Sequence, residues 1–345
     1  MKSTRSAWML NGMAVLLICG VACAQLPPSP ANMRGTRLRG GMPFSQGGAT
    51  LGNAPKPEAH SAQTPALSLT WSIYTFPGTV ATFTGSVNKS GHMVGGYGPD
   101  FVQDLPSDHA FLLKGNKFTT IDYPGAGWNE ADAISDSGVI VGTYGASYQS
   151  SDEHGFKLVG STYTSIDYPG ATGTGATAIN KKGDTVGFYF PVSSPEYPQA
   201  YLLSGGVFTS ITFPGALATI AWGINNSGEI VGWYIDTSND SHGFLLDAGT
   251  FTTIDYPGYT QNYVAGINDS GLMAGGYGDI TNITGVQYLW EHGYVYQSGT
   301  FTTFDAPFGP SAATQVWRIN DQDIITGFYA DSSGTPYGFE ATVGP

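Results

Sequence analysis

The sequence is poor in charged residues and cysteine, and it contains no long hydrophobic run. Only 11% of the 345 residues are charged, and the two cysteines are Cys19 and Cys23. The longest apolar run, Met13 to Val21, is shorter than the roughly 20 residues needed to cross a bilayer. We therefore expect no transmembrane segment. The net charge of −13 argues against a nucleic-acid partner, because binding phosphates requires a basic surface.

The N-terminus has the three parts of a secretory signal peptide. Lys2 and Arg5 precede the apolar run, and small residues ending at Ala24 form an A-x-A cleavage pattern. We expect residues 1–24 to be removed and the protein to be secreted. The mature chain would then lack cysteine and would depend on packing for its stability. Alternatively, the residues before Cys23 loosely resemble a lipobox, which would leave the protein lipid-anchored through Cys23.

The sequence is rich in glycine, proline and aromatic residues. The chain has 49 Gly, 21 Pro and 13% aromatic residues, a composition typical of many short strands joined by tight turns. Residues 25–66 are rich in Pro, Gly, Ala and Ser without an apolar pattern, and they predict a flexible linker. Residues 67–345 are predicted to form the folded domain.

One phrase recurs through residues 67–345. It reads TFTTIDYPG from Thr250 to Gly258, and related copies follow one another every 43 to 50 residues. The prolines of the six copies are Pro77, Pro124, Pro169, Pro214, Pro257 and Pro307. Each copy continues through a turn such as Asn-Asp-Ser-Gly to a Gly-x-Tyr, then a variable loop, then a strand such as His-Gly-Phe-Leu-Leu. These segments predict two hairpins, or four strands, in each repeat.

Repeats of this length and strand number indicate an all-β fold, a six-bladed β-propeller of four-stranded antiparallel blades. The last repeat ends at Pro345 without the TFTTIDYPG strand, whereas Ser68 to Gly78 supplies an unpaired copy of it near the N-terminus. We therefore expect the N-terminal strand to complete the last blade and close the ring.

The repeats resemble those of the bacterial extracellular HAF-repeat proteins. The resemblance rests on His109-Ala110-Phe111 and its variants, within repeats that carry G-I-N-x-x-G-x-I-V-G-x-Y, and it covers residues 67–345. It implies a secreted protein with a β-propeller fold. The resemblance implies no particular activity and assigns no catalytic residue in this sequence.

The Asp and His that recur in most repeats are predicted to be structural. Thr75 and Thr212 replace the Asp in two copies, and Gln199 and Tyr337 replace the His where it is missing, so a hydrogen bond is kept while the ionisable group is not. The ring would also spread the four recurring histidines around its axis rather than gather them into one tetrahedron. We therefore expect no metal site and no cofactor.

Residues that do not repeat are the better candidates for function. The loops after each Pro-Gly and each Gly-x-Tyr should open on one face, where aromatic rings and carboxylates would suit a sugar. Buried packing is the preferred interpretation for Trp222 and Trp317. The predicted ligand-binding residues are Trp128, Glu130, Tyr148, Trp233, Asp236, Asp279, Trp290 and Asp331.

The resulting hypothesis is a secreted, non-catalytic propeller that binds an extracellular glycan or envelope polymer. A glycoside hydrolase or polysaccharide lyase is an alternative, with Asp236 and Asp331 as weak candidate acids, which hydrolysis would require about 5 to 9.5 Å apart. A structural module that binds another protein is the third possibility. The sequence does not determine the oligomeric state.

Overall fold

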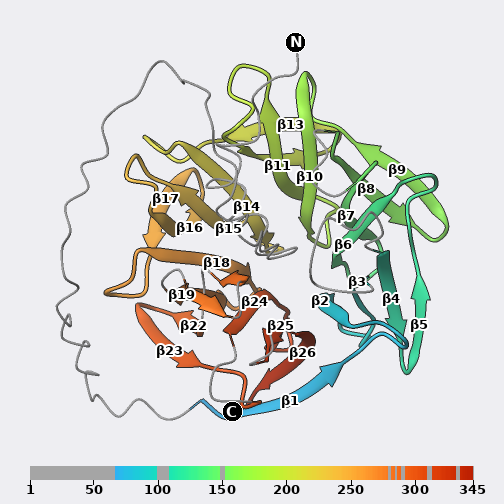
Figure 1. The fold of residues 1–345 in the computed structure, drawn as a ribbon. Helices are drawn as coiled ribbons and strands as arrows, with labels where there is room; N and C mark the ends of the chain where they lie inside the picture. Colours follow the sequence, from blue (N-terminus) through green and yellow to red (C-terminus); the bar gives the residue numbers. More distant parts are fainter. Residues whose placement is uncertain are drawn as a thin grey trace, which may run out of the picture.

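The computed structural model describes residues 67–98, 109–147, 152–278, 281–283, 286–288, 292–308, 313–331 and 335–344. All regular elements among them are β-strands. Figure 1 shows these strands arranged as sheets around a central axis. The predicted signal peptide and linker, residues 1–66, lie outside the described part of the chain.

The described strands form four four-stranded sheets, one eight-stranded sheet and one two-stranded ribbon. The first repeat forms a sheet of β2 (Ala81–Val87), β3 (Met93–Gly98), β4 (His109–Lys114) and β5 (Lys117–Thr120). The second repeat forms a sheet of β6 (Trp128–Ile134), β7 (Ile140–Gly145), β8 (His154–Val159) and β9 (Thr162–Ile166). The third repeat forms a sheet of β10 (Ala171–Ile179), β11 (Thr185–Pro191), β12 (Gln199–Ser204) and β13 (Val207–Ile211).

The eight-stranded sheet contains the fourth and fifth repeats. Its strands are β14 (Ala218–Ile224), β15 (Ile230–Ile235), β16 (Ser241–Asp247), β17 (Thr250–Ile254), β18 (Gln261–Ile267), β19 (Met273–Gly278), β22 (His292–Gln297) and β23 (Thr300–Phe304). The two-stranded ribbon is β20 (Thr281–Ile283) with β21 (Val286–Tyr288), and the remaining four-stranded sheet is β24 (Ala313–Ile319), β25 (Ile324–Ala330), β26 (Pro336–Val343) and β1 (Leu69–Tyr74).

The all-β propeller with four-stranded blades is confirmed, but the prediction of six separate blades is wrong. Four separate four-stranded blades are present, and the fourth and fifth repeats share one continuous sheet. The two are joined where Ser241 in β16 pairs in parallel with Gln261 in β18. The buried Ser241 donates its backbone N–H to Thr260, and its hydroxyl accepts the N–H of Asn262, so hydrogen bonds continue from one repeat into the next.

The sheet formed by β24, β25, β26 and β1 joins the two ends of the described chain. β1 pairs antiparallel with β26 over six residues, from Leu69 opposite Val343 to Tyr74 opposite Gly338. The hydroxyl of Thr326 in β25 also donates to the carbonyl of Gly85 in β2 at 2.6 Å. The N-terminal strand thus occupies the outer edge of the C-terminal sheet, as the leftover copy of the repeated phrase led us to expect (Figure 1).

The position of each strand follows from its residues. The innermost strands are almost wholly buried, whereas the outer strands, rich in Thr and Ser, are mostly exposed. A glycine near the start of each second strand allows the innermost strand to approach closely. At Gly142, for example, an added Cβ would lie 2.0 Å from the carbonyl oxygen of Glu130. Only glycine fits there.

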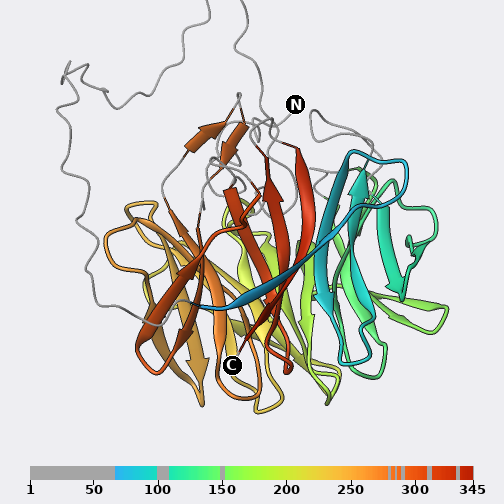
Figure 2. The ribbon, with the colours of Figure 1, turned by 90° about the horizontal axis from the view of Figure 1, so that it is seen from below.

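The strand directions give the ring two different ends. We call the end with the loops after Pro-Gly and Gly-x-Tyr the loop face, and the end with the Asn-x-Ser-Gly turns the turn face. Figure 2 shows the ring from the side, with the ribbon β20–β21 projecting from the loop face and short turns at the opposite end.

Candidate binding surfaces

Aromatic rings stack between neighbouring repeats on the loop face. The Tyr of each Tyr-Pro-Gly lies against the Tyr of the Gly-x-Tyr in the following repeat, as in the pair Tyr123 and Tyr144, whose centroids are 3.7 Å apart. His154 covers the other face of Tyr144 at 5.2 Å. The related stacks are Phe76–Tyr97–His109, Phe213–Tyr234–His242 and Tyr256–Tyr277–His292. These four stacks each join two neighbouring repeats.

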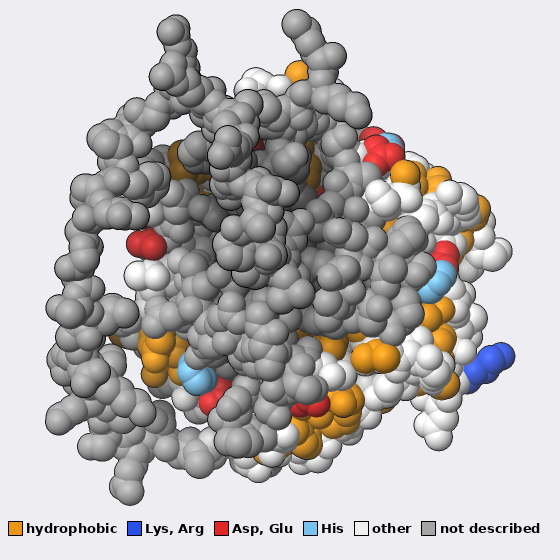
Figure 3. Space-filling model, in the orientation of Figure 1, with side chains coloured by type: hydrophobic (Ala, Val, Ile, Leu, Met, Phe, Trp, Pro, Cys, Tyr) orange, Lys and Arg blue, Asp and Glu red, His pale blue; other side chains and the backbone are white. Residues whose placement is uncertain are grey.

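Each recurring His is paired with the recurring Asp of its own repeat. The distances from His Nδ1 to the Asp carboxylate are 2.6 Å for His109–Asp122, 2.6 Å for His154–Asp167, 2.7 Å for His242–Asp255 and 2.9 Å for His292–Asp305. Figure 3 shows His side chains beside acidic ones at the periphery of the loop face. All four pairs are at least partly accessible to solvent.

The third repeat explains what this pair does. There Gln199 replaces the His and Thr212 replaces the Asp, and the two side chains still form a hydrogen bond of 3.0 Å. Asp122 also accepts the backbone N–H of Ala110, so it holds the start of one strand against the end of the next. The structural role predicted for the recurring Asp is confirmed. The pairing of Asp with His was missed, although both residues change together in the third repeat.

Two of the three tryptophans predicted for the site lie in the interior. Trp128 and Trp233 are only 5% and 1% exposed, and Trp233 belongs to the largest hydrophobic cluster. Trp222 and Trp317 are buried as well, which confirms their predicted packing role. Glu130 is half-buried in β6. The structure therefore brings no aromatic platform of these tryptophans to the surface.

Asp236 and Asp331 lie on the loop face at equivalent positions of the fourth and sixth repeats. The carboxylate of Asp236 accepts the backbone N–H groups of Ser238 and Asp240 and lies 3.6 Å from Nε2 of His242. Partial burial raises the pKa of Asp236, but these hydrogen bonds and His242 together hold it below its ordinary value. Asp331 accepts the N–H of Thr335. Each acid thus stabilises its own loop.

The other three predicted site residues, Tyr148, Asp279 and Trp290, lie outside the described residues.

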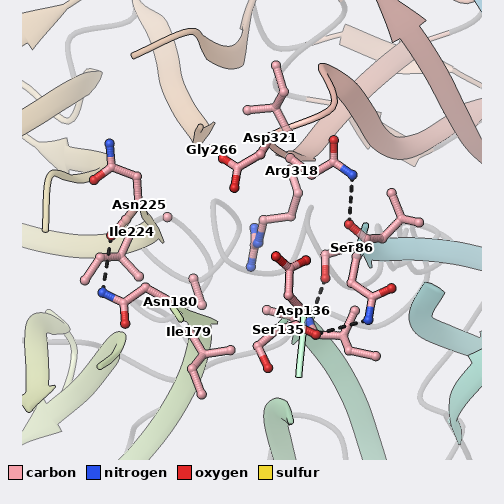
Figure 4. A pocket seen from close by; sticks show the side chains of 18 of the residues that line it. Ser86, Ser135, Asp136, Ile179, Asn180, Ile224, Asn225, Gly266, Arg318 and Asp321 are labelled. Carbon is pink, nitrogen blue, oxygen red and sulfur yellow. Dashed lines mark hydrogen bonds between the residues drawn. The ribbon is translucent and has the colours of Figure 1, made fainter. Parts of the chain in front are cut away.

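A cavity of about 120 Å³ lies at the centre of the turn face, where the turns after the innermost strands meet. Figure 4 shows Arg318 reaching into this cavity, with Asp136 and Asp321 beside it. Five of these six turns carry an Asn that accepts backbone N–H groups within its turn and donates to a carbonyl of the next repeat at 3.1 to 3.4 Å. The donors are Asn88, Asn180, Asn225, Asn268 and Asn320.

Lys181 occupies the middle of this opening. Its Nζ lies 3.2 Å from Asp321, 3.5 Å from Asp269 and 3.7 Å from Asp136, which belong to three other repeats. The hydrogen bond and negative charge of Asp321 raise the pKa of Lys181. The turn face is therefore closed by hydrogen bonds and ion pairs among its own residues.

Arg318 belongs to β24 of the sixth repeat and lies deeper in the ring, where its side chain contacts the second and third repeats. Its guanidinium donates to the carbonyls of Thr177 and Trp317 and lies 4.0 Å from Asp132. Burial raises the pKa of Asp132 to about 7, although the charge of Arg318 acts in the opposite direction. Within the described residues, no three His, Asp or Glu side chains form a metal-binding group, and no helix is long and apolar enough to cross a membrane.

No known protein family matches the sequence, so the likeness to HAF-repeat proteins remains a resemblance of motifs. No curated protein matches it either. Among solved structures, a fucose-specific lectin from Aleuria aurantia is 12% identical with a TM-score of 0.46, over 81% of this chain and 95% of the lectin. A mutant of AofleA from Arthrobotrys oligospora is 12% identical with a TM-score of 0.43, over 80% and 84% of the two chains.

TolB from Acinetobacter baumannii is 11% identical with a TM-score of 0.44, over 73% of this chain. The chain spans 64% of the length of TolB. None of these similarities assigns a function to this chain.

Proposed function

We propose that this protein is a secreted, non-catalytic propeller that binds an extracellular glycan through its loop face. The difference between the two ends of the ring carries the proposal. Loops that differ among the repeats leave one end, whereas repeated turns tied to one another close the other end. Variable loops on a rigid scaffold are where binding residues are usually found.

The chemistry of the loop face supports a ligand rich in hydroxyl groups. The faces of its tyrosine rings are covered by one another and by histidine, so a ligand would meet ring edges, imidazole Nε2 atoms and carboxylates. Nε2 can donate or accept a hydrogen bond, and a carboxylate accepts them, which matches sugar hydroxyls. Asp236, Asp331, Glu130, Tyr148, Asp279 and Trp290 remain our proposed contact residues, and Trp128 and Trp233 would support them from the interior.

The absence of catalysis is part of the proposal. Asp236 and Asp331 each hold their own loop and occupy equivalent places in two different repeats, an arrangement that serves a turn rather than an acid–base pair. The extracellular location rests on the predicted signal peptide.

Binding to cellulose, chitin, xylan and mannan tests the proposal, with the full chain and a loop-face variant compared. The variant replaces three His–Asp pairs by the Gln–Thr pair of the third repeat: His109→Gln with Asp122→Thr, His242→Gln with Asp255→Thr, and His292→Gln with Asp305→Thr. Because the third repeat folds with that pair, the variant should fold. We expect binding to fall at least about tenfold, since charge-assisted hydrogen bonds contribute strongly to recognition.

The reverse change, Gln199→His with Thr212→Asp, adds a fifth pair and should strengthen binding. Unchanged binding by the loop-face variant would exclude the His–Asp pairs from the binding site. Unchanged binding by a second variant, Asp236→Asn with Asp331→Asn, as well would contradict the assignment of the loop face. Release of new reducing ends or unsaturated products from any polysaccharide would show that the protein is an enzyme.

A further inference from the structure

A groove of about 430 Å³ lies between the second and third repeats, on the outer side of the ring. One wall is formed by β8 and β9 of the second repeat, and the other by β11, β12 and β13 of the third. The volume falls in the range of small-ligand sites, about 300 to 1,000 Å³. Comparison with the other repeats shows why the space is open here.

The first wall departs from the repeat at Lys157. The same position holds Leu112, Leu202, Leu245 and Val295 in four other repeats. Each of these apolar side chains packs into a hydrophobic cluster with residues of the following repeat. Lys157 instead lines the groove, because an ammonium group cannot be buried in such a cluster without a partner.

The second wall departs from the repeat at Thr185. In the other repeats this position holds Met93, Ile140, Ile230, Met273 and Ile325. Leu112 and Ile140 fall in one hydrophobic cluster, as do Leu202 and Ile230, and Leu245 and Met273. At the groove, both members of this apolar pair have been replaced, by Lys157 and the buried Thr185, so the junction lacks this one apolar contact beside its own hydrophobic cluster.

The floor of the groove and its edges carry complementary chemistry. Leu203 and Phe208 provide apolar surface, whereas Lys157 and Thr164, which are register partners in β8 and β9, provide an ammonium group and a hydroxyl from the opposite wall. The bend at Gly205 and Gly206 adds backbone without side chains, and a Cβ added to either would meet no atom within 4 Å. A pyranose ring has the matching pattern, with apolar C–H faces and hydroxyls at its edge.

We propose that this groove is a binding site for a neutral pyranosyl unit. The inference rests on the proposed glycan-binding function and adds a second location to it. A neutral sugar is favoured over an acidic one because the chain carries a net charge of −13, which repels an anionic polymer. Lys157 then donates to sugar hydroxyls rather than pairing with a carboxylate.

The test restores the apolar pair of the neighbouring junction in the full chain, with Lys157→Leu and Thr185→Ile together. The probes are cellotetraose, chitotetraose, xylotetraose and mannotetraose, with tetragalacturonate as the acidic comparison, and isothermal titration gives the affinities. We expect at least one neutral probe to bind the natural chain and to bind the double variant at least about tenfold more weakly. The midpoint of thermal unfolding should rise or stay equal, because two apolar side chains fill the groove.

The single variant Lys157→Leu should give the same direction of change if the double variant overpacks the junction. Leu245→Met, at the junction of the fourth and fifth repeats, is the control and should leave affinity unchanged. Equal binding by the natural chain and both groove variants would overturn this site while leaving the proposed function in place. Binding of no neutral probe would overturn both, and tighter binding of tetragalacturonate would overturn the neutral class.

Discussion

Asp132 shows how burial changes the chemistry of a single residue in this ring. It is almost fully buried, and Arg318 is its nearest described cation at 4.0 Å. Removal from water disfavours the charged carboxylate more than the single arginine favours it, so the pKa rises to about 7. The folded protein therefore holds a proton on Asp132 at pH values where the unfolded chain has lost it.

The first prediction concerns pH. Because the folded pKa of Asp132 lies above the ordinary 3.8, its contribution to stability is greatest below about pH 4 and is lost as the pH rises towards 7. Asp132→Asn removes this titration. We expect the free energy of unfolding of the variant, relative to the natural chain, to increase by about 3 kcal/mol between pH 4 and pH 7.5.

Urea unfolding of both proteins at these two pH values measures the difference, and the comparison cancels groups that titrate in both. A difference that does not change with pH would show that Asp132 keeps an ordinary pKa.

At the scale of elements, the Asn-x-Ser-Gly turns do more than reverse the chain. In the fourth repeat, Asn225 accepts the backbone N–H groups of Ser227 and Glu229, and its amide donates to the carbonyl of Asn268 in the fifth repeat. Ser135 stands at this position in the second repeat and keeps a turn bond, accepting the N–H of Val139. The Asn225 side chain thus stabilises both its own turn and the contact with the next repeat.

The second prediction separates these two contributions. Asn225→Ser keeps an acceptor for the turn but loses the bond to the next repeat, and it should lower the free energy of unfolding by about 1 kcal/mol. Asn225→Ala loses both and should cost about 2 to 3 kcal/mol. Chemical denaturation gives both values. Equal losses for the two variants would mean that the turn acceptor contributes nothing, and no loss for Asn225→Ser would mean that the bond between repeats contributes nothing.

The sequence predicted the strands and turns well, because strand alternation and turn residues are local signals. It failed where a feature depends on contact between repeats. The bonds from Asn225 to Asn268 connect residues 43 positions apart, and the parallel pairing of Ser241 with Gln261 has no local signature. The sequence predicted that the Asn-x-Ser-Gly turns form hairpins, but it did not predict that their Asn side chains bond to the next repeat.

The predicted site residues show the same limit. Trp233 looked like a non-repeating surface residue, but Phe188 and Phe328 occupy the same repeat position and are also buried. Aligning the second strands of the repeats would have shown this. The groove beside Lys157 could be recognised in the same way, from an apolar repeat position that becomes charged, but the matching change at Thr185 acquires meaning only when the two walls face each other.

At the scale of the whole molecule, the third prediction concerns the strand that joins the two ends. A chain that begins at residue 75 lacks β1 and exposes the edge of β26. It also loses Trp71, which packs against Phe304, Phe308 and Phe339. We expect a loss of at least about 3 kcal/mol in the free energy of unfolding, together with self-association through the open edge.

Thermal unfolding and size-exclusion chromatography measure the two effects, and a chain that begins at residue 67, which keeps β1, is the control. Equal stability of the two truncated chains would show that β1 does not close the ring.

The same pairing determines how the protein responds to mechanical load. Leu69, the first residue of β1, lies opposite Val343 at the end of β26, and Gly344 donates its N–H to the carbonyl of Ser68. A pull applied through the chain before Leu67 therefore reaches this end of the ladder first and breaks its bonds one pair at a time, as in unzipping. The strands β2 to β25 each have a strand before and after them in the chain, so we expect tension from an N-terminal attachment to open the ring at this seam before it unfolds any repeat.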